Sequence, residues 1–208
     1  MALTTGPLMS LDASGSIAGT LVFSKWKGRN YVRQLVTPSN PKSAKQVSVR
    51  AMFGFLAQEW ATLSAGLQAT WQALADATTI SPFNAYVSNN QARYAAGLSP
   101  GQSYPVSELD LAGVINVPTG QGGVREALIQ WGLSTVNQNW GAQVHRSKTG
   151  GFTPSLSTCV GVVPDNDTGV TTFTDTPVEP GSYFYRVIPF SADGKTGSAS
   201  TEITVTVQ

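Results

Sequence analysis

The hydrophobic and polar positions follow three different patterns along the chain. Two β-rich runs near the N-terminus, 17–24 and 30–36, are joined by Lys27-Gly28, and this predicts a β-hairpin. Residues 43–96 carry apolar side chains at intervals of three and four, the spacing of amphipathic helices. Beyond residue 104, short β-rich runs alternate with turn clusters. The pattern therefore predicts a hairpin, then about three helices, then an all-β domain.

The three helices are predicted from apolar stripes and from the residues that precede them. Ser43 and Ser64 stand at N-cap positions, and Ser81-Pro82 opens the third helix, where proline loses no hydrogen bond. The stripes consist of Val49, Met52, Phe53, Leu56, Trp60 and Leu63, then Leu67, Trp71 and Leu74, then Phe83, Tyr86, Val87 and Tyr94. We interpret Trp60 and Trp71 as core residues rather than as platforms for sugars.

The C-terminal half predicts a β-sandwich, because its short strands have the spacing of two packed antiparallel sheets. In one run, Tyr183, Tyr185 and Val187 alternate with residues that face the other way. Trp140, near a strand start, is the best candidate for an exposed aromatic residue. The predicted strands lie in the runs 111–117, 125–133, 139–147, 157–163, 169–175, 182–191 and 198–207.

These patterns divide the chain into four parts. They are an N-terminal arm (1–14), a hairpin-and-helix domain (15–97), a linker (98–107) and a sandwich (108–208). The linker is predicted from the turn-forming composition of the sequence LSPGQSY. The predicted fold class is an α+β N-terminal domain followed by an all-β sandwich.

Charge is distributed unevenly between the two halves. Residues 1–100 hold eight basic and three acidic residues, whereas residues 101–208 hold five and nine. Charged residues make up only 12% of the chain, and about 25% is usual. A neutral polar surface is easily desolvated, so this composition favours extensive protein contacts. The opposed charges favour either two domains with different surroundings or copies that pack head to tail.

The strongest functional candidate is the basic hairpin together with the segment that follows it. Seven basic residues and no acidic residue lie between Lys25 and Arg50. Three interpretations are open: an ordinary solvated surface, docking onto an acidic protein, or contact with nucleic acid through phosphates and base stacking. The candidate partner-binding residues are Lys25, Trp26, Lys27, Arg29, Tyr31, Arg33, Lys42 and Lys45.

Residues that carry catalytic or metal chemistry are sparse. His145 is the only histidine and lies on a predicted strand, and Cys159, the only cysteine, is predicted to be a core or strand residue. A nucleophile elbow and a four-ligand zinc set are both missing from the sequence. Asp165, Asp167 and Asp175 could hold calcium weakly, although a turn with Asx hydrogen bonds is the preferred interpretation. We therefore expect no catalytic residue, no metal site and no cofactor.

Residues 108–208 resemble a fibronectin type III domain. The resemblance rests on Ile129 and Trp131 and on the sequences VHRSKTGGFTP, VEPGSYFYRV and SADGKTGSAS. It implies that Trp131 packs in the core and that either Tyr183 or Tyr185 is the corner tyrosine. Domains of this class serve adhesion, spacing and display without a shared chemistry.

Residues 10–97 resemble a family of bacteriophage and prophage proteins of uncharacterised or virion-structural description. The matching sequences are GSIAGTLVFSKWKGRNYVRQLVTPSNPKSAKQ, LSAGLQATWQALA and SPFNAYVSNNQARY. The resemblance implies a non-enzymatic virion protein, anchored at the tail, collar or head-to-tail region, that displays its sandwich outward. The alternatives are a capsid decoration protein and a receptor-binding or carbohydrate-binding module.

The same resemblance favours protein docking over the other two interpretations of the basic hairpin. The implied partners are tail, portal-adaptor or capsid subunits and further copies of this chain in a ring or multicopy assembly. A weak contact with the host surface is a further implied partner, and nucleic acid is not expected to be one. Arg29 and Arg33 are the preferred contacts, because guanidinium groups bind carboxylates with two hydrogen bonds. The sequence shows no secretory signal and no apolar run of the ~20 residues that a membrane helix needs. We therefore expect assembly in the host cytoplasm, localisation in the virion and no membrane partner.

Overall fold

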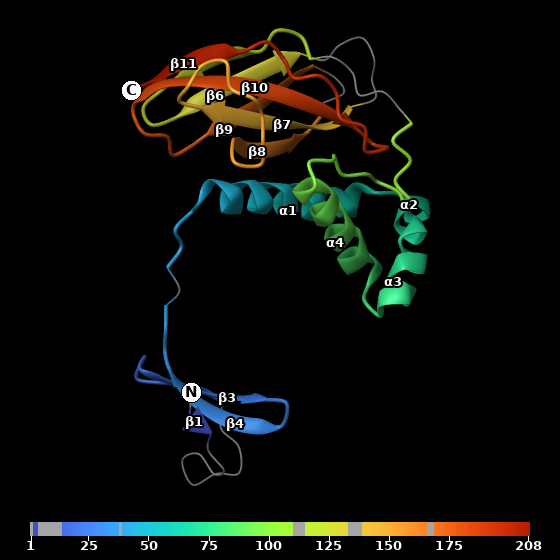
Figure 1. The fold of residues 1–208 in the computed structure, drawn as a ribbon, viewed down its shortest axis with the longest axis vertical. Helices are drawn as coiled ribbons and strands as arrows, with labels where there is room; N and C mark the ends of the chain where they lie inside the picture. Colours follow the sequence, from blue (N-terminus) through green and yellow to red (C-terminus); the bar gives the residue numbers. More distant parts are fainter. Residues whose placement is uncertain (1, 4–13, 38, 110–114, 133–138, 166–168) are drawn as a thin grey trace. The chain divides into compact units, whose positions relative to one another are not determined.

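The computed structural model describes residues 2–3, 14–37, 39–109, 115–132, 139–165 and 169–208. The chain forms two compact units, Met1–Pro41 and Lys42–Gln208. The described part of the first unit is a small β-sheet, and that of the second combines helices with a β-sandwich (Figure 1).

The sheet of Met1–Pro41 is antiparallel, with the strand order β1-β4-β3-β2. The predicted hairpin is confirmed: its two turn residues, Lys27 and Gly28, have φ angles of 48° and 77°, as a type I′ turn requires. The predicted N-terminal arm is partly wrong, because Ala2 pairs with Val32 and adds a strand to the sheet. Residues 4–13 of that arm lie outside the described residues. The strands are β1 (Ala2–Leu3), β2 (Gly15–Ile17), β3 (Leu21–Trp26) and β4 (Arg29–Gln34).

The β-sandwich of Lys42–Gln208 is built from two antiparallel sheets, as the alternating runs predicted. One sheet has the order β5-β6-β9 and the other β11-β10-β7-β8. The strands are β5 (Thr119–Gly122), β6 (Ala127–Gly132), β7 (Asn139–Ser147), β8 (Cys159–Pro164), β9 (Val170–Asp175), β10 (Gly181–Ser191) and β11 (Ile203–Val207).

The core between these sheets contains the residues that the alternation selected. Trp131 on β6 is 2% exposed, and Tyr183, Tyr185 and Val187 on β10 are all buried. The Tyr183 hydroxyl donates a hydrogen bond to the backbone carbonyl of Glu179 (2.9 Å). This return to the chain a few residues upstream is the geometry of a corner tyrosine. Tyr183 rather than Tyr185 therefore occupies that position.

The first predicted strand is misplaced. Residues 111–114 of that run lie outside the described residues, and Ile115–Val117 are not in a strand; β5 begins at Thr119. The sequence TGQG of β5 has no apolar alternation. A side chain on Gly122 would place its Cβ within about 1.8 Å of the Thr206 carbonyl oxygen, a separation that atoms cannot adopt. Close packing against β11 thus requires glycine in β5, and glycine removes the apolar alternation that indicates a strand.

Four helices are present in the described part of the second unit: α1 (Ala44–Thr62), α2 (Ala65–Thr70), α3 (Gln72–Thr78) and α4 (Pro82–Ala95). The hydroxyls of Ser64 and Ser81 accept hydrogen bonds from backbone N–H groups of α2 and α4, as predicted. Ser43 stands at the N-cap position of α1 without a side-chain cap bond. The predicted second helix is interrupted at Trp71, which separates α2 from α3.

Helix α1 and its C-cap residue bury Met52, Leu56 and Leu63 of the predicted stripe, but the buried face is rotated away from two other predicted residues. Val49 and Phe53 are 46% and 49% exposed, whereas Ser48 and Phe55 are buried. The reason is tertiary: α1 packs against β8 of the sandwich, as Figure 1 shows. The Phe55 ring lies 5.4 Å from the Phe190 ring of β10. The sandwich, rather than the other helices alone, therefore decides which face of α1 is buried.

Trp140 belongs to the same aromatic cluster and was wrongly predicted to be exposed. Its side chain is 7% exposed and its ring lies 4.9 Å from that of Phe55. Its indole Nε1–H donates a hydrogen bond to a Glu59 carboxylate oxygen of α1 (2.7 Å). The Trp140 ring and its N–H group are therefore both covered by α1 and the sandwich, so this side chain cannot stack on a sugar.

The compact units divide the chain differently from the expected domains 15–97 and 108–208. The hairpin forms its own unit, and the helices share an apolar cluster with the sandwich. The expected linker, 98–107, is packed: Ser99 and Pro100 are buried. In the described residues, no helix is long and apolar enough to cross a membrane.

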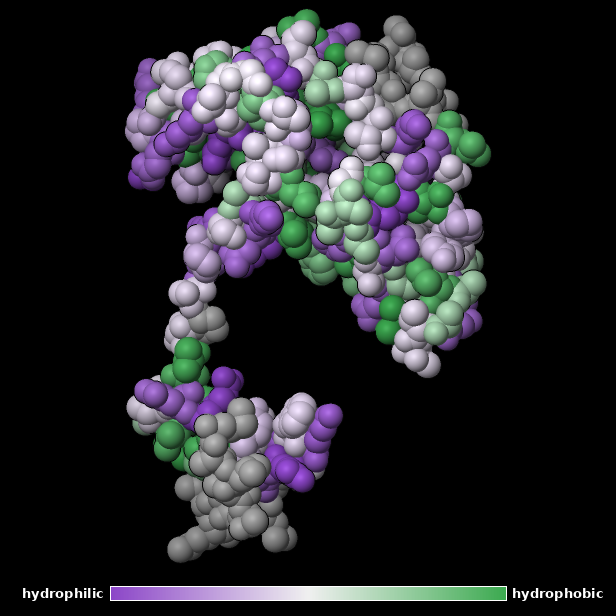
Figure 2. Space-filling view, in the orientation of Figure 1, coloured by the Kyte–Doolittle hydropathy of each residue, from purple (hydrophilic) through white to green (hydrophobic). Residues whose placement is uncertain are grey.

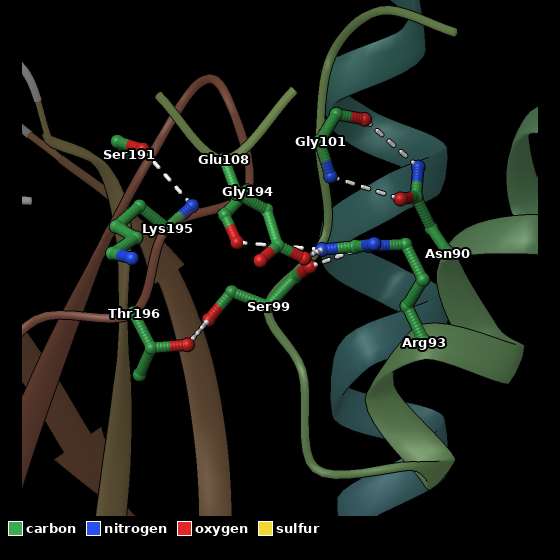
Figure 3. Close-up of polar contacts among 9 residues, drawn as sticks. All are labelled: Asn90, Arg93, Ser99, Gly101, Glu108, Ser191, Gly194, Lys195 and Thr196. Atoms are coloured by element: carbon green, nitrogen blue, oxygen red, sulfur yellow. Dashed lines mark hydrogen bonds and ion pairs between the residues drawn. The ribbon is translucent and has the colours of Figure 1, made fainter. Parts of the chain in front are cut away.

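A polar seam fastens α4 and the segment 98–108 to the sandwich (Figure 3). The Arg93 guanidinium donates to the Ser99 carbonyl (3.0 Å) and pairs with the Glu108 carboxylate (2.6 Å), which lowers the Glu108 pKa. The Ser99 hydroxyl is hydrogen-bonded to the Thr196 hydroxyl (2.7 Å). The Asn90 side chain bonds both the N–H and the carbonyl of Gly101 (2.9 and 3.0 Å). Helices and sandwich are therefore one body.

Candidate partner-docking surface

The register of the β3–β4 hairpin sorts the predicted docking residues by face. Cross-strand partners in an antiparallel pair share a face, and neighbours along a strand alternate. Trp26 pairs with Arg29, Ser24 with Tyr31, and Val22 with Arg33. One face of the hairpin therefore carries Trp26, Arg29, Tyr31 and Arg33 together, and we call it the Trp/Arg face.

The Trp/Arg face is open to solvent. Trp26 is 65% exposed, and Arg29 and Arg33 are exposed as well. The Lys27 ammonium lies 4.7 Å from the centre of the Trp26 ring, a cation–π distance. Within the described residues, neither arginine forms an ion pair. Figure 2 shows hydrophilic surface at the turn end of the hairpin.

The local charge is also one-sided. Residues 1–41 hold four basic residues and one acidic residue, whereas residues 42–208 hold nine and eleven. The formal charges of the two units are therefore +3 and −2. Both arginines of the Trp/Arg face consequently stand in a positive field that the sheet unit does not neutralise.

The opposite face of the hairpin has a different character. Phe23 pairs with Val32, and Lys25 pairs with Asn30. Phe23 is 9% exposed, whereas Lys25 on the same face is exposed. Lys25, one of the predicted docking residues, lies on this side rather than on the Trp/Arg face.

Two further predicted residues belong to the second unit. Lys42 has a φ of 47° and lies before α1, and Lys45 lies in the first turn of that helix. Both are exposed. The structure thus brings four of the predicted residues together on one face, while Lys42 and Lys45 stand on a different body.

The residues considered for catalysis and metal binding lie in structural positions. Cys159 is 1% exposed on β8, as predicted for a core residue, and burial raises the pKa of its thiol. Asp175 pairs with Arg146 (2.7 Å) and accepts a hydrogen bond from the Tyr185 hydroxyl (3.0 Å). Asp167 lies outside the described residues. No cluster of three or more potential metal ligands occurs in the part that the structure describes.

His145 lies on strand β7, as predicted, and is 2% exposed. Burial lowers the pKa of its imidazole to about 4, against the opposing effect of a backbone hydrogen bond to Ser155. The ring is therefore neutral at pH 7. It lines a pocket beside α4 that the sequence pattern gave no means of finding, since the pocket depends on how the helices pack on the sandwich.

No family profile and no curated protein matches the chain. Among solved structures, 28 chains match. One is an Fn3-like protein from Clostridium thermocellum, 20% identical, with a TM-score of 0.35; the match covers 47% of this chain and 95% of that one. Another is the β-1,2-glucanase from Parabacteroides distasonis, 16% identical, with a TM-score of 0.35; the match covers 47% of this chain and 12% of that one. These likenesses concern about half of the chain.

Proposed function

We propose that this chain is a non-enzymatic structural protein of a bacteriophage particle, and that its N-terminal sheet docks onto an acidic neighbouring subunit through the Trp/Arg face. The attachment point is the tail, the collar or the head-to-tail region; a capsid decoration protein is the alternative position. The observation that carries the proposal is the grouping of Trp26, Arg29, Tyr31 and Arg33 on one face, where Tyr31 is half-buried and the other three are exposed.

The residue types on this face are those that dominate protein interfaces. Trp, Tyr and Arg are enriched among the residues that contribute most binding energy. Arginine tolerates burial in an interface better than lysine, because its guanidinium group is weakly hydrated and forms paired hydrogen bonds with a carboxylate. An acidic surface with an apolar recess for Trp26 would complement all four side chains.

The second unit would act as the displayed body of the particle protein. We assign its sandwich to the fibronectin type III class, which the three-plus-four division of strands, the buried Trp131 and the corner Tyr183 support. Helices α1 and α4 brace one side of this sandwich. The apolar cluster that the helices share with the sandwich makes the second unit a single packed body, which suits a spacer in a multicopy assembly.

The test is a charge reversal on the Trp/Arg face. Arg29→Glu with Arg33→Glu should leave the circular dichroism spectrum and the thermal unfolding unchanged, since both residues are exposed. The same variant should be missing from purified particles, because like charges now face the acidic partner. Quantitative mass spectrometry of particles from complemented infections measures the copy number.

A matched control changes charge on the opposite face of the same two strands. Lys25→Glu with Gln34→Glu alters residues that share the Phe23 side of the hairpin. This double variant should enter particles at the wild-type level. Normal incorporation of the Arg29→Glu, Arg33→Glu protein, or equal loss in both double variants, would contradict docking through the Trp/Arg face.

A further inference from the structure

Helix α1 leaves a hollow open to solvent on the side that the sandwich does not cover. The hollow has a volume of ≈ 280 Å³ and is lined by Lys45, Gln46, Val49 and Arg50. Val49 is 46% exposed, and Phe53, one helical turn further on, is 49% exposed. Neighbouring exposed apolar side chains with polar residues around them are typical of a protein contact. We call this surface the α1 hollow.

The rim of the α1 hollow is basic. Lys45 and Arg50 line it, and Lys42 lies two residues before the helix. The one acidic residue of α1 is Glu59, whose carboxylate accepts a hydrogen bond from the Trp140 side chain (2.7 Å). Among the described residues, Lys45 forms no ion pair. A partner for the hollow should therefore present an apolar side chain next to acidic ones.

The turn between β5 and β6 presents such a group on the sandwich. Val124 in this turn is 77% exposed. Glu126 is exposed and forms no ion pair within the part of the chain that the structure describes. Glu179 lies beside the turn, since its carboxylate pairs with the Arg125 guanidinium (2.5 Å). These two acids and one base give a net charge of −1 next to Val124, and we call residues 123–126 with Glu179 the acidic turn.

Backbone hydrogen bonds hold the acidic turn in place. The Gly123 N–H donates to the Glu126 carbonyl (2.9 Å), and the Gly123 carbonyl accepts from the Gln208 N–H (2.9 Å). The Arg125 N–H donates to the Gln208 carbonyl (2.8 Å), and the Arg125 carbonyl accepts from the Val178 N–H (2.9 Å). A side chain that is presented by a fixed backbone loses little conformational entropy when it docks.

We infer that the acidic turn of one copy docks into the α1 hollow of a second copy. Val124 would lie against Val49 and Phe53, and Glu126 would face Lys45. Both surfaces are exposed, so neither covers the other within one copy. Because the two surfaces differ, each added copy leaves one hollow and one turn free, and such contacts build rings or filaments. The inference rests on the multicopy role proposed for the second unit and not on the Trp/Arg face.

Two charge reversals in the full-length protein test the pairing by sedimentation velocity at low ionic strength. The wild-type sedimentation coefficient should rise with protein concentration. Lys45→Glu opposes two glutamates and Glu126→Lys opposes two lysines, so each variant alone should associate about tenfold more weakly or worse. Both residues are exposed, so the variants should fold.

An equimolar mixture of the two variants should associate as the wild type does. The hollow of the Lys45→Glu protein then accepts the turn of the Glu126→Lys protein, and the unchanged hollow and turn still complement each other. A pairing of two hollows, or of two turns, would not be restored in this way. A mixture that associates no better than its components, or single variants that associate like the wild type, would overturn the inference.

Two exposed valines of the sandwich supply a matched control. Val124→Lys should abolish the association, whereas Val170→Lys should leave it unchanged, because Val170 is 55% exposed on β9 and lies outside the acidic turn. Equal losses in both variants, or wild-type protein that stays monomeric up to about 1 mM, would refute the contact. Docking through the Trp/Arg face is measured separately, by incorporation of the Arg29→Glu, Arg33→Glu protein into particles, so either proposal can fail alone.

Discussion

At the scale of single residues, tertiary contacts decided the roles of several side chains that sequence reasoning had treated alike. Trp26 is the last residue of β3, and Trp140 stands near the start of β7. Trp26 is 65% exposed opposite Arg29, whereas Trp140 is 7% exposed and bonded to Glu59. The difference comes from helix α1, which packs on β8 and covers Trp140.

His145 should make the stability of the protein depend on pH. Its pKa is about 4 in the folded state, below the ordinary 6.5 of an unfolded chain. The unfolded state therefore binds more protons between these values, and the stability is complete above about pH 6.5 and falls as the pH drops toward 4. The loss amounts to about 3 kcal/mol. Urea unfolding between pH 7 and pH 4 measures it.

The control for this pH dependence is His145→Gln, which keeps a polar side chain and removes the titration. Carboxylates contribute to the acid slope in both proteins, so the difference between the two curves isolates the histidine. The variant should be less stable than the wild type at pH 7 and should lose less stability on acidification. Parallel curves for the two proteins would contradict a depressed histidine pKa.

At the scale of elements, strands with strict alternation were predictable and helix orientation was not. The run that contains Tyr183, Tyr185 and Val187 gave β10 and its buried face directly, because a period of two fixes both. β5 was missed because its glycines serve close packing against β11. The face of α1 was misjudged at Val49 and Phe53, since their stripe is equally apolar and only the sandwich selects Ser48 and Phe55 for burial.

For the docking candidates, too, the sequence predicts local structure but not the long-range contacts between elements. The basic run located the hairpin, and its turn residues fixed the register that groups Trp26, Arg29, Tyr31 and Arg33. The assignment of Lys25 to the opposite face follows once the register is known. The placement of Lys42 and Lys45 in another unit does not, because a boundary between bodies depends on which long-range contacts form.

Asn90 tests the attachment of α4 to the segment 98–108, which the Ser99–Thr196 hydrogen bond joins to the sandwich. The side chain is fully buried and satisfies both backbone groups of Gly101. Asn90→Ala would leave two buried backbone groups without their partners, at about 2–4 kcal/mol in all. We expect tryptophan fluorescence and far-ultraviolet circular dichroism to report one transition, shifted to lower temperature.

The matched control is Asn84→Ala in the same helix, because Asn84 is exposed and its substitution should alter stability by no more than about 0.5 kcal/mol. Two separate transitions in the Asn90→Ala protein, with the sandwich unfolding at its original temperature, would mean that the helices and the sandwich are independent domains.

At the scale of the whole molecule, the two units differ in charge and in what holds them together. Both large apolar clusters are built from residues of Lys42–Gln208. The sheet of Met1–Pro41 has its own strand order and a single strongly buried described side chain, Phe23. A small positive unit with an exposed Trp/Arg face and a larger, slightly negative body are thus suited to separate tasks.

Removal of residues 1–41 separates those tasks. The chain 42–208 should fold and unfold within about 4 °C of the full-length protein, a shift equivalent to about 1 kcal/mol or less for a domain of this size. It should be missing from purified particles, because the Trp/Arg face is gone.

Residues 1–41 fused to an unrelated soluble protein should carry that protein into particles. Raised ionic strength during assembly should reduce the incorporation of this fusion, since exposed charge contacts are screened by salt. Particles that still contain 42–208 at the wild-type level would move the attachment site to the second unit, where Lys42 and Lys45 would then be the basic residues to reverse.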